Sequence, residues 1–241
     1  MPLKLFESAA AQAGALVSMV SLHLLGEPLT HPEFPAVLRT CSRLGLEVNL
    51  VTNGLLLGSY QDALFSEPCL RQVSISLHAL ATLPHGERRA ALAGLIAFAK
   101  KKRQGMVIGF RLRCASHDAF FSATLQSVLD AFGHGGAPAS GYVKLADRVF
   151  LNFGGMFAWP GSGRGNGKTG CLALRHHFGI LSDGRVVPCC ADYDGALALG
   201  DIKEDRLADL LEGPAAEALR AGFRGRAPMP AYCKACGFAA P

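Results

Sequence analysis

Residues 171–190 read CLALRHHFGILSDGRVVPCC, and residues 233–236, near the end of the chain, read CKAC. In the first stretch, twelve residues separate Cys171 from Gly184, and four more separate Gly184 from Cys189. The second stretch is a CxxC turn. Two thiols on one tight turn point to a common centre, and a second pair completes four sulfur ligands, a set that suits zinc or an iron-sulfur cluster. The predicted ligands are Cys171, Cys189, Cys233 and Cys236.

The residues between the two cysteine pairs predict a hairpin followed by a helix. Two β-prone runs, 178–181 and 185–188, flank a Ser-Asp-Gly turn, so the hairpin would return Cys189 to the neighbourhood of Cys171. Residues 199–223 then carry apolar side chains at helical spacing.

The order of cysteine, hairpin, PCC, LGDI, helix and CxxC resembles the SPASM module that is appended to radical S-adenosylmethionine (radical SAM) enzymes. In that family such cysteines hold an auxiliary 4Fe-4S cluster. The resemblance implies that the four predicted ligands hold this cluster and that Cys190 is a neighbour or a substitute. Zinc stays an alternative, because the spacing defines four sulfurs but not the metal.

Composition and charge narrow the class of protein. Half of the 241 residues are apolar, enough for one large domain and a small appended one. The formal net charge is +5. A Lys-Lys-Lys-Arg run at 100–103 stands at the C-terminal end of a predicted helix, where the helix dipole stabilises positive charge. We therefore interpret this run as a solvated helix end and not as a nucleic-acid site. The chain has neither an apolar run of the roughly 20 residues that a membrane helix needs nor the apolar core of an export signal. We expect a cytoplasmic protein without nucleic-acid or membrane partners.

Predicted helices and strands alternate along the first two thirds of the chain. The predicted helices are 3–15, 32–45, 59–68, 86–103 and 119–133, and the predicted strands are 16–25, 46–54, 71–79, 106–114 and 142–153. The first strand is apolar on both faces and is expected to be buried. The alternation indicates parallel βα units, either in an open doubly wound sheet or in part of a barrel. Residues 160–170 are a glycine-rich linker.

Polar residues stand at the C-terminal ends of these strands, where parallel α/β folds bind ligands. Gly26 lets the backbone approach a ligand, and the Glu27 carboxylate offers an acceptor for an ammonium group. Arg111 and Arg113 alternate with apolar residues, so their guanidinium groups share one strand face. There they would either bind a carboxylate of a cofactor or substrate or face solvent.

Two of these segments extend the resemblance to the radical SAM core. HLLGEPLTHPEF (23–34) resembles the GEP motif that binds the methionine amino group of S-adenosyl-L-methionine, and VNLVTNG (48–54) resembles the strand that follows it. The resemblance runs from about Leu16 to Phe238. The cofactor contacts that it implies are Gly26, Glu27, Pro28, Asn53, Ser76 and Arg111.

The resemblance implies an α/β fold with three parts: a partial (βα) barrel of parallel strands at 1–159, the linker at 160–170 and a SPASM-like auxiliary cluster domain at 171–241. It also implies an oxidoreductase that cleaves S-adenosyl-L-methionine reductively to modify a small-molecule or peptide substrate. Such an enzyme takes its electrons from a donor such as a flavodoxin or a ferredoxin.

The chain departs from the family in lacking the CxxxCxxC loop whose three thiolates hold the catalytic cluster. Cys41, Cys69 and Cys114 are isolated in apolar surroundings and are interpreted as core residues, so no catalytic residue is assigned. In the family that loop precedes the helix leading to the GEP strand, so we expect a first strand to be missing in front of Met1 through a truncated gene model or an internal start. Two alternatives stay open: a non-catalytic protein that carries or binds a 4Fe-4S cluster, and a structural zinc module.

Overall fold

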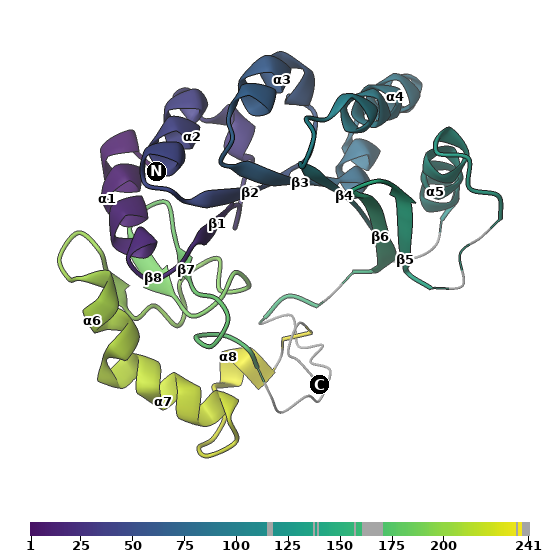
Figure 1. The fold of residues 1–241 in the computed structure, drawn as a ribbon. Helices are drawn as coiled ribbons and strands as arrows, with labels where there is room; N and C mark the ends of the chain where they lie inside the picture. Colours follow the sequence, from purple (N-terminus) through teal and green to yellow (C-terminus); the bar gives the residue numbers. More distant parts are fainter. Residues whose placement is uncertain are drawn as a thin grey trace. The chain divides into compact units, whose positions relative to one another are not determined.

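The structure is a computed structural model that describes residues 1–114, 118–136, 138, 140–156, 158–160, 171–234 and 236–237. The chain divides into two compact units (Figure 1). The first is the continuous segment Ser18–Met156, and the second combines Met1–Val17 with Phe157–Pro241. Residues 161–170, most of the predicted linker, lie outside the described residues.

The unit Ser18–Met156 is built on a six-stranded sheet with the strand order β1-β2-β3-β4-β6-β5. Its strands are β1 (Met19–Leu22), β2 (Glu47–Thr52), β3 (Leu70–Ser76), β4 (Val107–Cys114), β5 (Tyr142–Ala146) and β6 (Val149–Gly155). All neighbouring pairs are parallel except β5 and β6. Because successive parallel strands are neighbours, each crossover steps in the same direction, as in a barrel and unlike a doubly wound sheet. The predicted α/β fold of parallel strands is confirmed, in its barrel form.

The helices of this unit cover one face of the sheet (Figure 1). They are α2 (Phe34–Arg43), α3 (Leu57–Ser66), α4 (His85–Lys101) and α5 (Ala119–Ala131), and two 3-10 helices, η1 (Pro28–Thr30) and η2 (Leu77–Thr82), follow β1 and β3. On β4, Ile108, Phe110 and Leu112 are fully buried, whereas the alternating residues Arg111 and Arg113 are half-buried. Since successive side chains of a strand point to opposite faces, the arginines lie on the face opposite the apolar core.

That second face is polar. Asn49 Nδ2 on β2 donates to Ser21 Oγ on β1 (3.3 Å), and Ser74 Oγ on β3 donates to Asn49 Oδ1 (3.1 Å). The row continues through Arg111 on β4 to Asn152 on β6, its partner in register. Strands of parallel sheets are usually apolar on both faces. We call the face that carries these residues the polar face.

The prediction of a buried first strand was wrong. β1 has four residues, Met19 in it is 45% exposed, and the side chain of Leu25 beyond it is 73% exposed. Within the described residues β1 pairs with β2 alone, so its other edge has no strand partner there. The backbone then leaves the extended conformation at Leu24 (φ 93°) and Gly26 (φ 107°). A further strand in front of Met1 stays a prediction.

The predicted single strand at 142–153 is a hairpin. β5 and β6 are antiparallel and meet at a turn in which Arg148 has a positive φ of 53°. Short hairpin turns with positive φ usually contain glycine or asparagine, and Asp147-Arg148 contains neither. The turn therefore lacked its usual sequence signal.

The second unit contains short elements. They are α1 (Leu3–Gly14), β7 (Gly179–Ile180), β8 (Arg185–Val187), β9 (Gly200–Asp201), α6 (Leu207–Glu212), α7 (Pro214–Phe223) and α8 (Ala231–Lys234). The predicted hairpin is confirmed, because β7 and β8 pair antiparallel. The helical pattern at 199–223 begins instead with β9, which pairs with β8, and is then divided into two helices at Gly213.

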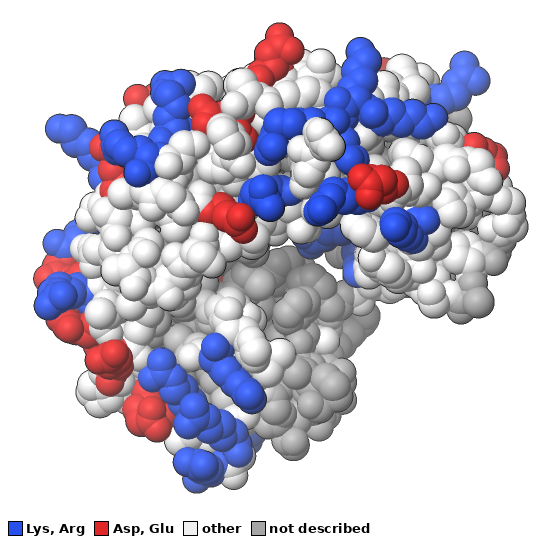
Figure 2. Space-filling view, viewed as in Figure 1, with Lys and Arg blue, Asp and Glu red and all other residues white. Residues whose placement is uncertain are grey.

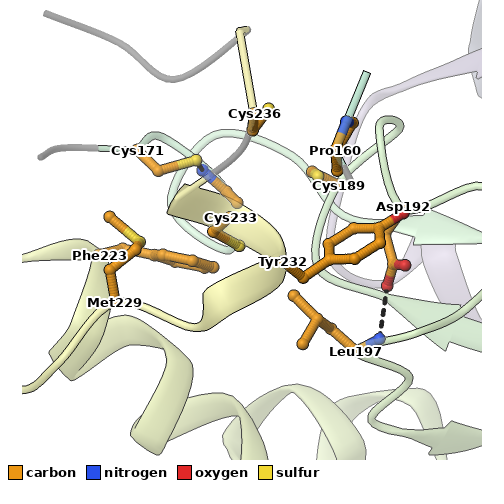
Figure 3. Close-up of a pocket in the computed structure, with 11 residues that line it drawn as sticks. Pro160, Cys171, Cys189, Asp192, Leu197, Phe223, Met229, Tyr232, Cys233 and Cys236 are labelled. Carbon is orange, nitrogen blue, oxygen red and sulfur yellow. Dashed lines mark hydrogen bonds between the residues drawn. The ribbon is translucent and has the colours of Figure 1, made fainter. Parts of the chain in front are cut away.

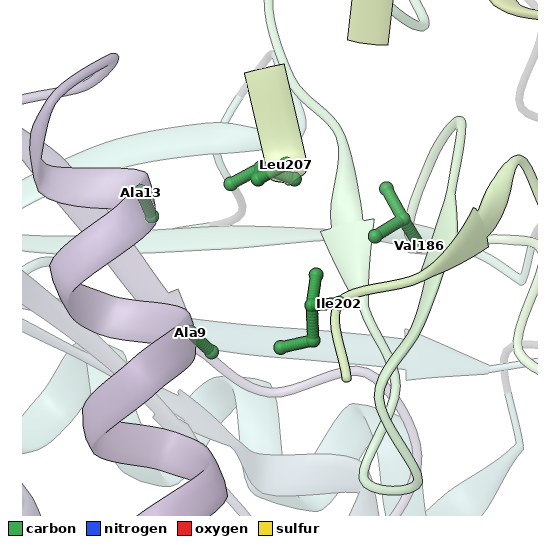
Figure 4. Close-up of a cluster of buried hydrophobic side chains, with 5 residues drawn as sticks. All are labelled: Ala9, Ala13, Val186, Ile202 and Leu207. Carbon is green, nitrogen blue, oxygen red and sulfur yellow. The ribbon is translucent and has the colours of Figure 1, made fainter. Parts of the chain in front are cut away.

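Helix α1 packs against the C-terminal part of the chain. Its buried Ala9 and Ala13 join Val186, Ile202 and Leu207 in one apolar cluster (Figure 4). Gln12 Oε1 also accepts a hydrogen bond from the backbone N–H of Leu207 (2.7 Å), the first residue of α6. The sequence analysis assigned this helix to the partial barrel, whereas its contacts group it with Phe157–Pro241.

Two side chains of the cationic run at 100–103 donate hydrogen bonds to backbone carbonyl groups. Lys100 Nζ donates to the carbonyl of Ala131 (2.6 Å), and Arg103 Nη2 donates to the carbonyl of Leu70 (2.7 Å). Lysine and arginine side chains lie over the face shown in Figure 2 together with aspartates and glutamates. In the described part of the chain, no helix has both the length and the apolar character that membrane crossing requires.

We expect Gln12→Ala to destabilise the C-terminal unit by about 1 kcal/mol, because the substitution leaves the first N–H of α6 without its acceptor. Urea denaturation would measure the change. Gln126→Ala is the matched control, since Gln126 makes only an exposed side-chain hydrogen bond to Asp130 on its own helix. Equal midpoints for the two variants would contradict a role for Gln12 in holding α6.

Candidate metal centre and ligand-binding face

The four predicted cysteine ligands line one pocket of the second unit (Figure 3). Cys171 opens the described segment before β7, Cys189 follows β8, Cys233 lies in α8, and Cys236 follows that helix. Apolar side chains complete the walls, among them Leu197, Phe223 and Met229. The fold thus brings together two cysteine pairs that lie more than 40 residues apart in the sequence.

The thiols of this pocket act on one another electrostatically. Burial raises the pKa of Cys189 to about 11 and, together with the nearby Cys189, Cys171 and Cys236, raises the pKa of Cys233 to about 12. Several thiolates would therefore repel one another here unless a cation balanced them. A bound metal supplies that positive charge and holds coordinating thiols in the deprotonated form.

A buried carboxylate shapes the loop that carries Cys189. Asp192 has no exposed surface, and it accepts hydrogen bonds from the N–H groups of Ala196 (2.8 Å) and Leu197 (3.0 Å). Burial raises the pKa of Asp192, although these two hydrogen bonds oppose the shift. The loop is therefore folded around one internal acceptor.

A second contact joins this loop to the CxxC turn. Tyr232, next to Cys233, donates its hydroxyl hydrogen bond to Asp194 Oδ1 (2.9 Å). Neither Asp192 nor Asp194 was among the residues predicted from the sequence. The signal that could have found them is the Asp-Tyr-Asp-Gly run at 192–195, because aspartate and glycine favour tight turns.

The donor set in the pocket fits a soft metal or an iron-sulfur cluster. Four cysteines line one pocket with apolar walls, and thiolates are the usual ligands of zinc and iron-sulfur centres. As the side chains stand, no three His, Cys, Asp or Glu residues of the described segments form a group that could hold a metal ion. The four cysteines line the same pocket, and their coordination of a metal would require side-chain rotation. The assignment of the four cysteines stays a prediction.

Four other cysteines lie outside the pocket lining. Cys41 is fully buried, as the sequence analysis expected, and burial raises the pKa of its thiol to about 12. Cys69 and Cys114 are half-buried. Cys190 does not line the pocket either, so the structure favours Cys189 as the pocket-lining member of the Cys-Cys pair.

The Glu27 carboxylate joins the ends of β1 and β2 in the sheet unit. Its Oε1 accepts hydrogen bonds from the N–H of Leu29 (3.1 Å) and the hydroxyl of Thr52 (2.7 Å), and its Oε2 accepts one from the N–H of Asn53 (2.6 Å). Gly26, which precedes Glu27, has a positive φ of 107°, a backbone conformation that residues other than glycine rarely adopt. A carboxylate accepts about four hydrogen bonds, so Glu27 has about one acceptor position left for a ligand.

The remaining predicted cofactor contacts lie at the same edge of the sheet. Ser76 and Arg111 are register partners on β3 and β4, and Arg111 pairs on its other side with Asn152. Asn53 follows β2, where its side-chain oxygen accepts from the N–H of Leu55 (2.9 Å). Pro28 begins η1 directly after Glu27. The fold thus gathers all six predicted contacts at the C-terminal ends of the strands, and their binding of a cofactor stays a prediction.

Comparison with protein families identifies the C-terminal region. Residues 171–237 match the SPASM family model, described as an iron-sulfur cluster-binding domain. The match includes all four cysteines of the pocket. A search of curated proteins gave no match.

Several solved structures share the fold. BtrN in complex with AdoMet and 2-DOIA is 15% identical, with a TM-score of 0.55 over 98% of this chain and 80% of BtrN. SuiB of Streptococcus suis is 17% identical, with a TM-score of 0.62 over 92% of this chain and 62% of SuiB. SuiB bound to the precursor peptide SuiA gives a TM-score of 0.61 at 17% identity, over 98% of this chain and 63% of that chain.

The chain therefore spans less than two thirds of SuiB, and at these identities the similarity shows the fold. Together, the SPASM match at residues 171–237 and the shared fold confirm the resemblance to radical SAM/SPASM proteins that was drawn from the sequence.

Proposed function

We propose that this chain is a radical SAM/SPASM-type oxidoreductase that holds a 4Fe-4S cluster in the cysteine pocket and binds S-adenosyl-L-methionine on the polar face. In a protein that also carries the catalytic cluster of a CxxxCxxC loop, the reaction would be the reductive cleavage of that cofactor, with an electron from a donor such as a flavodoxin or a ferredoxin, to begin radical modification of a small-molecule or peptide substrate. The observation that carries the proposal is the SPASM match over the segment whose four cysteines line one pocket.

At the cysteine pocket, the protein's part is to position and stabilise sulfur. The backbone N–H of Ala173 donates to Cys171 Sγ (3.4 Å), and N–H groups of Ala191 and Asp192 favour negative charge on Cys189. Such N–H bonds to sulfur tune the potential of a thiolate-bound cluster. A bound cluster supplies one-electron chemistry, and the apolar walls keep water away from it.

At the polar face, each end of the amino-acid part of the cofactor finds a residue of opposite charge. The remaining acceptor position of Glu27 suits one N–H of an ammonium group. Arg111 suits the carboxylate, and the Ser76 hydroxyl beside it offers a further hydrogen bond. Because Glu27 is held by the backbone of Asn53, its orientation is set before any ligand binds.

The proposal of a peptide substrate rests on one of the structures that share the fold. SuiB, which shares the fold, has been crystallised with its precursor peptide. A peptide substrate for this chain is consistent with that similarity. A second candidate function is a non-catalytic protein that carries a cluster, and the 241 residues of this chain, which contain no CxxxCxxC loop, are compatible with it.

The metal content of the anaerobically reconstituted chain tests the cluster assignment. We expect about four irons and four sulfides per chain, with most of both lost in Cys233→Ala, because one of the four thiolates is removed. Cys69→Ala is the matched control, since Cys69 lies outside the pocket lining and should leave the iron content unchanged. One zinc without sulfide would instead identify a structural zinc module.

Calorimetric titration with S-adenosyl-L-methionine tests the polar face. Glu27→Gln should weaken binding by about tenfold or more, because its amide nitrogen cannot accept hydrogen bonds and the charge that attracts the ammonium group is lost. Glu33→Gln is the control, since Glu33 is exposed and its side chain makes no cap at the start of α2. Equal affinities for these two variants would argue against Glu27 as a cofactor contact.

A further inference from the structure

Arg113 is held in a fixed orientation on the polar face. Its Nη2 donates to Asn152 Oδ1, so the side chain reaches from β4 across to β6. Its register partner on β6 is Gly154, and a Cβ atom added there would lie 3.5 Å from Arg113 Nη1. The guanidinium group therefore lies in van der Waals range of the position that a Cβ atom at Gly154 would take.

The positive charge at this place has no acidic partner among the described residues. None of the ion pairs there includes Arg111 or Arg113, and Asn152 offers only a neutral amide. Burial and the neighbouring Arg111 hold the pKa of Arg113 below its ordinary value. Two half-buried cations side by side repel each other, and an anion between or beside them would remove that cost.

His78 adds no further charge near these arginines at pH 7. Burial and the two arginines hold the pKa of His78 below its ordinary value, so its imidazole is neutral near pH 7. Its Nδ1 is buried and has no hydrogen-bond partner in the described structure. Two cations, Arg111 and Arg113, thus lie near a buried nitrogen that has no hydrogen-bond partner among the described residues. A ligand that binds here could satisfy these groups.

One carboxylate of the cofactor accounts for Arg111 but not for Arg113. Arg111 stands between Ser76 on β3 and Asn152 on β6, whereas Arg113 is two residues, or roughly 7 Å, further along β4 and is turned toward β6. The fork of a guanidinium group matches the two oxygens of a second carboxylate.

We propose that Arg113, oriented by Asn152, binds a carboxylate group of the substrate. The inference rests on the proposed function, because it assumes that Arg111 is taken by the cofactor. It adds the substrate class, which is a small carboxylic acid or a peptide. In a peptide the carboxylate would belong to an acidic side chain or to the C-terminus. Arg113 would thereby orient the substrate on the polar face next to the cofactor.

The test follows the Arg113 Nε–Hε NMR signal while three peptides are added to the S-adenosyl-L-methionine-saturated protein. The probes are Ac-Gly-Glu-Gly-NH2, Ac-Gly-Gln-Gly with a free C-terminal carboxylate, and the neutral Ac-Gly-Gln-Gly-NH2. A shift with either acidic peptide and none with the neutral one supports the proposal, and the active peptide identifies the source of the carboxylate. No shift with either acidic peptide, or an equal shift with all three, overturns it.

Asn152→Asp is the decisive variant, because it keeps the shape of the side chain and its bond to Arg113 but fills the site with an internal carboxylate. We expect at least tenfold weaker binding of the acidic peptide to the protein saturated with S-adenosyl-L-methionine. Arg71→Gln is the control, since Arg71 is exposed and pairs with Glu47. Undiminished peptide binding by Asn152→Asp would overturn the proposal.

A melting experiment on the same variant needs no ligand. If the charge on Arg113 is unbalanced in the free protein, Asn152→Asp should raise the melting temperature by about 2–4 °C. An unchanged or lower melting temperature contradicts the proposal. Failure of the wild type to bind S-adenosyl-L-methionine would instead count against the proposed function, so the two failures are distinguishable.

Discussion

The alternation of side chains along β4 is the constraint on which the sheet unit depends. Ile108, Phe110 and Leu112 are fully buried toward the helices, and this burial places Arg111 and Arg113 on the other face. A shift of one residue in the register would bury two guanidinium groups in the apolar core, at a cost no domain of this size could offset. The same packing that stabilises the fold therefore also creates its cationic binding face.

The second unit faces a different physical problem, because its strands are only two or three residues long. Such a small sheet buries little apolar surface. Its apolar cluster is completed by α1, which is distant in the sequence, and its other end is organised by the cysteine pocket and the buried Asp192. Small domains of this kind commonly rely on a metal centre for part of their stability. Under the proposed function, the four thiols would therefore serve folding as well as redox chemistry.

Local patterns predicted most elements of the sheet unit because helix and strand periodicity is a short-range property. They were wrong where the outcome depended on neighbours: the apolar run at 16–25 became a short exposed edge strand, and residues 142–153 folded back through the turn at Arg148. The partnership of α1 with Leu207 was equally invisible, because nothing in the helix itself specifies a contact 195 residues away.

For the candidate sites, the sequence by itself determined the chemistry: four cysteines at ligand spacing, a GEP segment and two arginines in alternation, since residue type and spacing are local facts. Only the tertiary structure decided how those groups are used. It placed the thiols in one apolar pocket and occupied three acceptor positions of Glu27 with the protein's own donors. It also turned Arg113 toward Asn152 without giving it an acidic partner among the described residues. The physical reason is that burial, charge balance and hydrogen-bond saturation depend on residues from different strands, which meet only when the chain has folded.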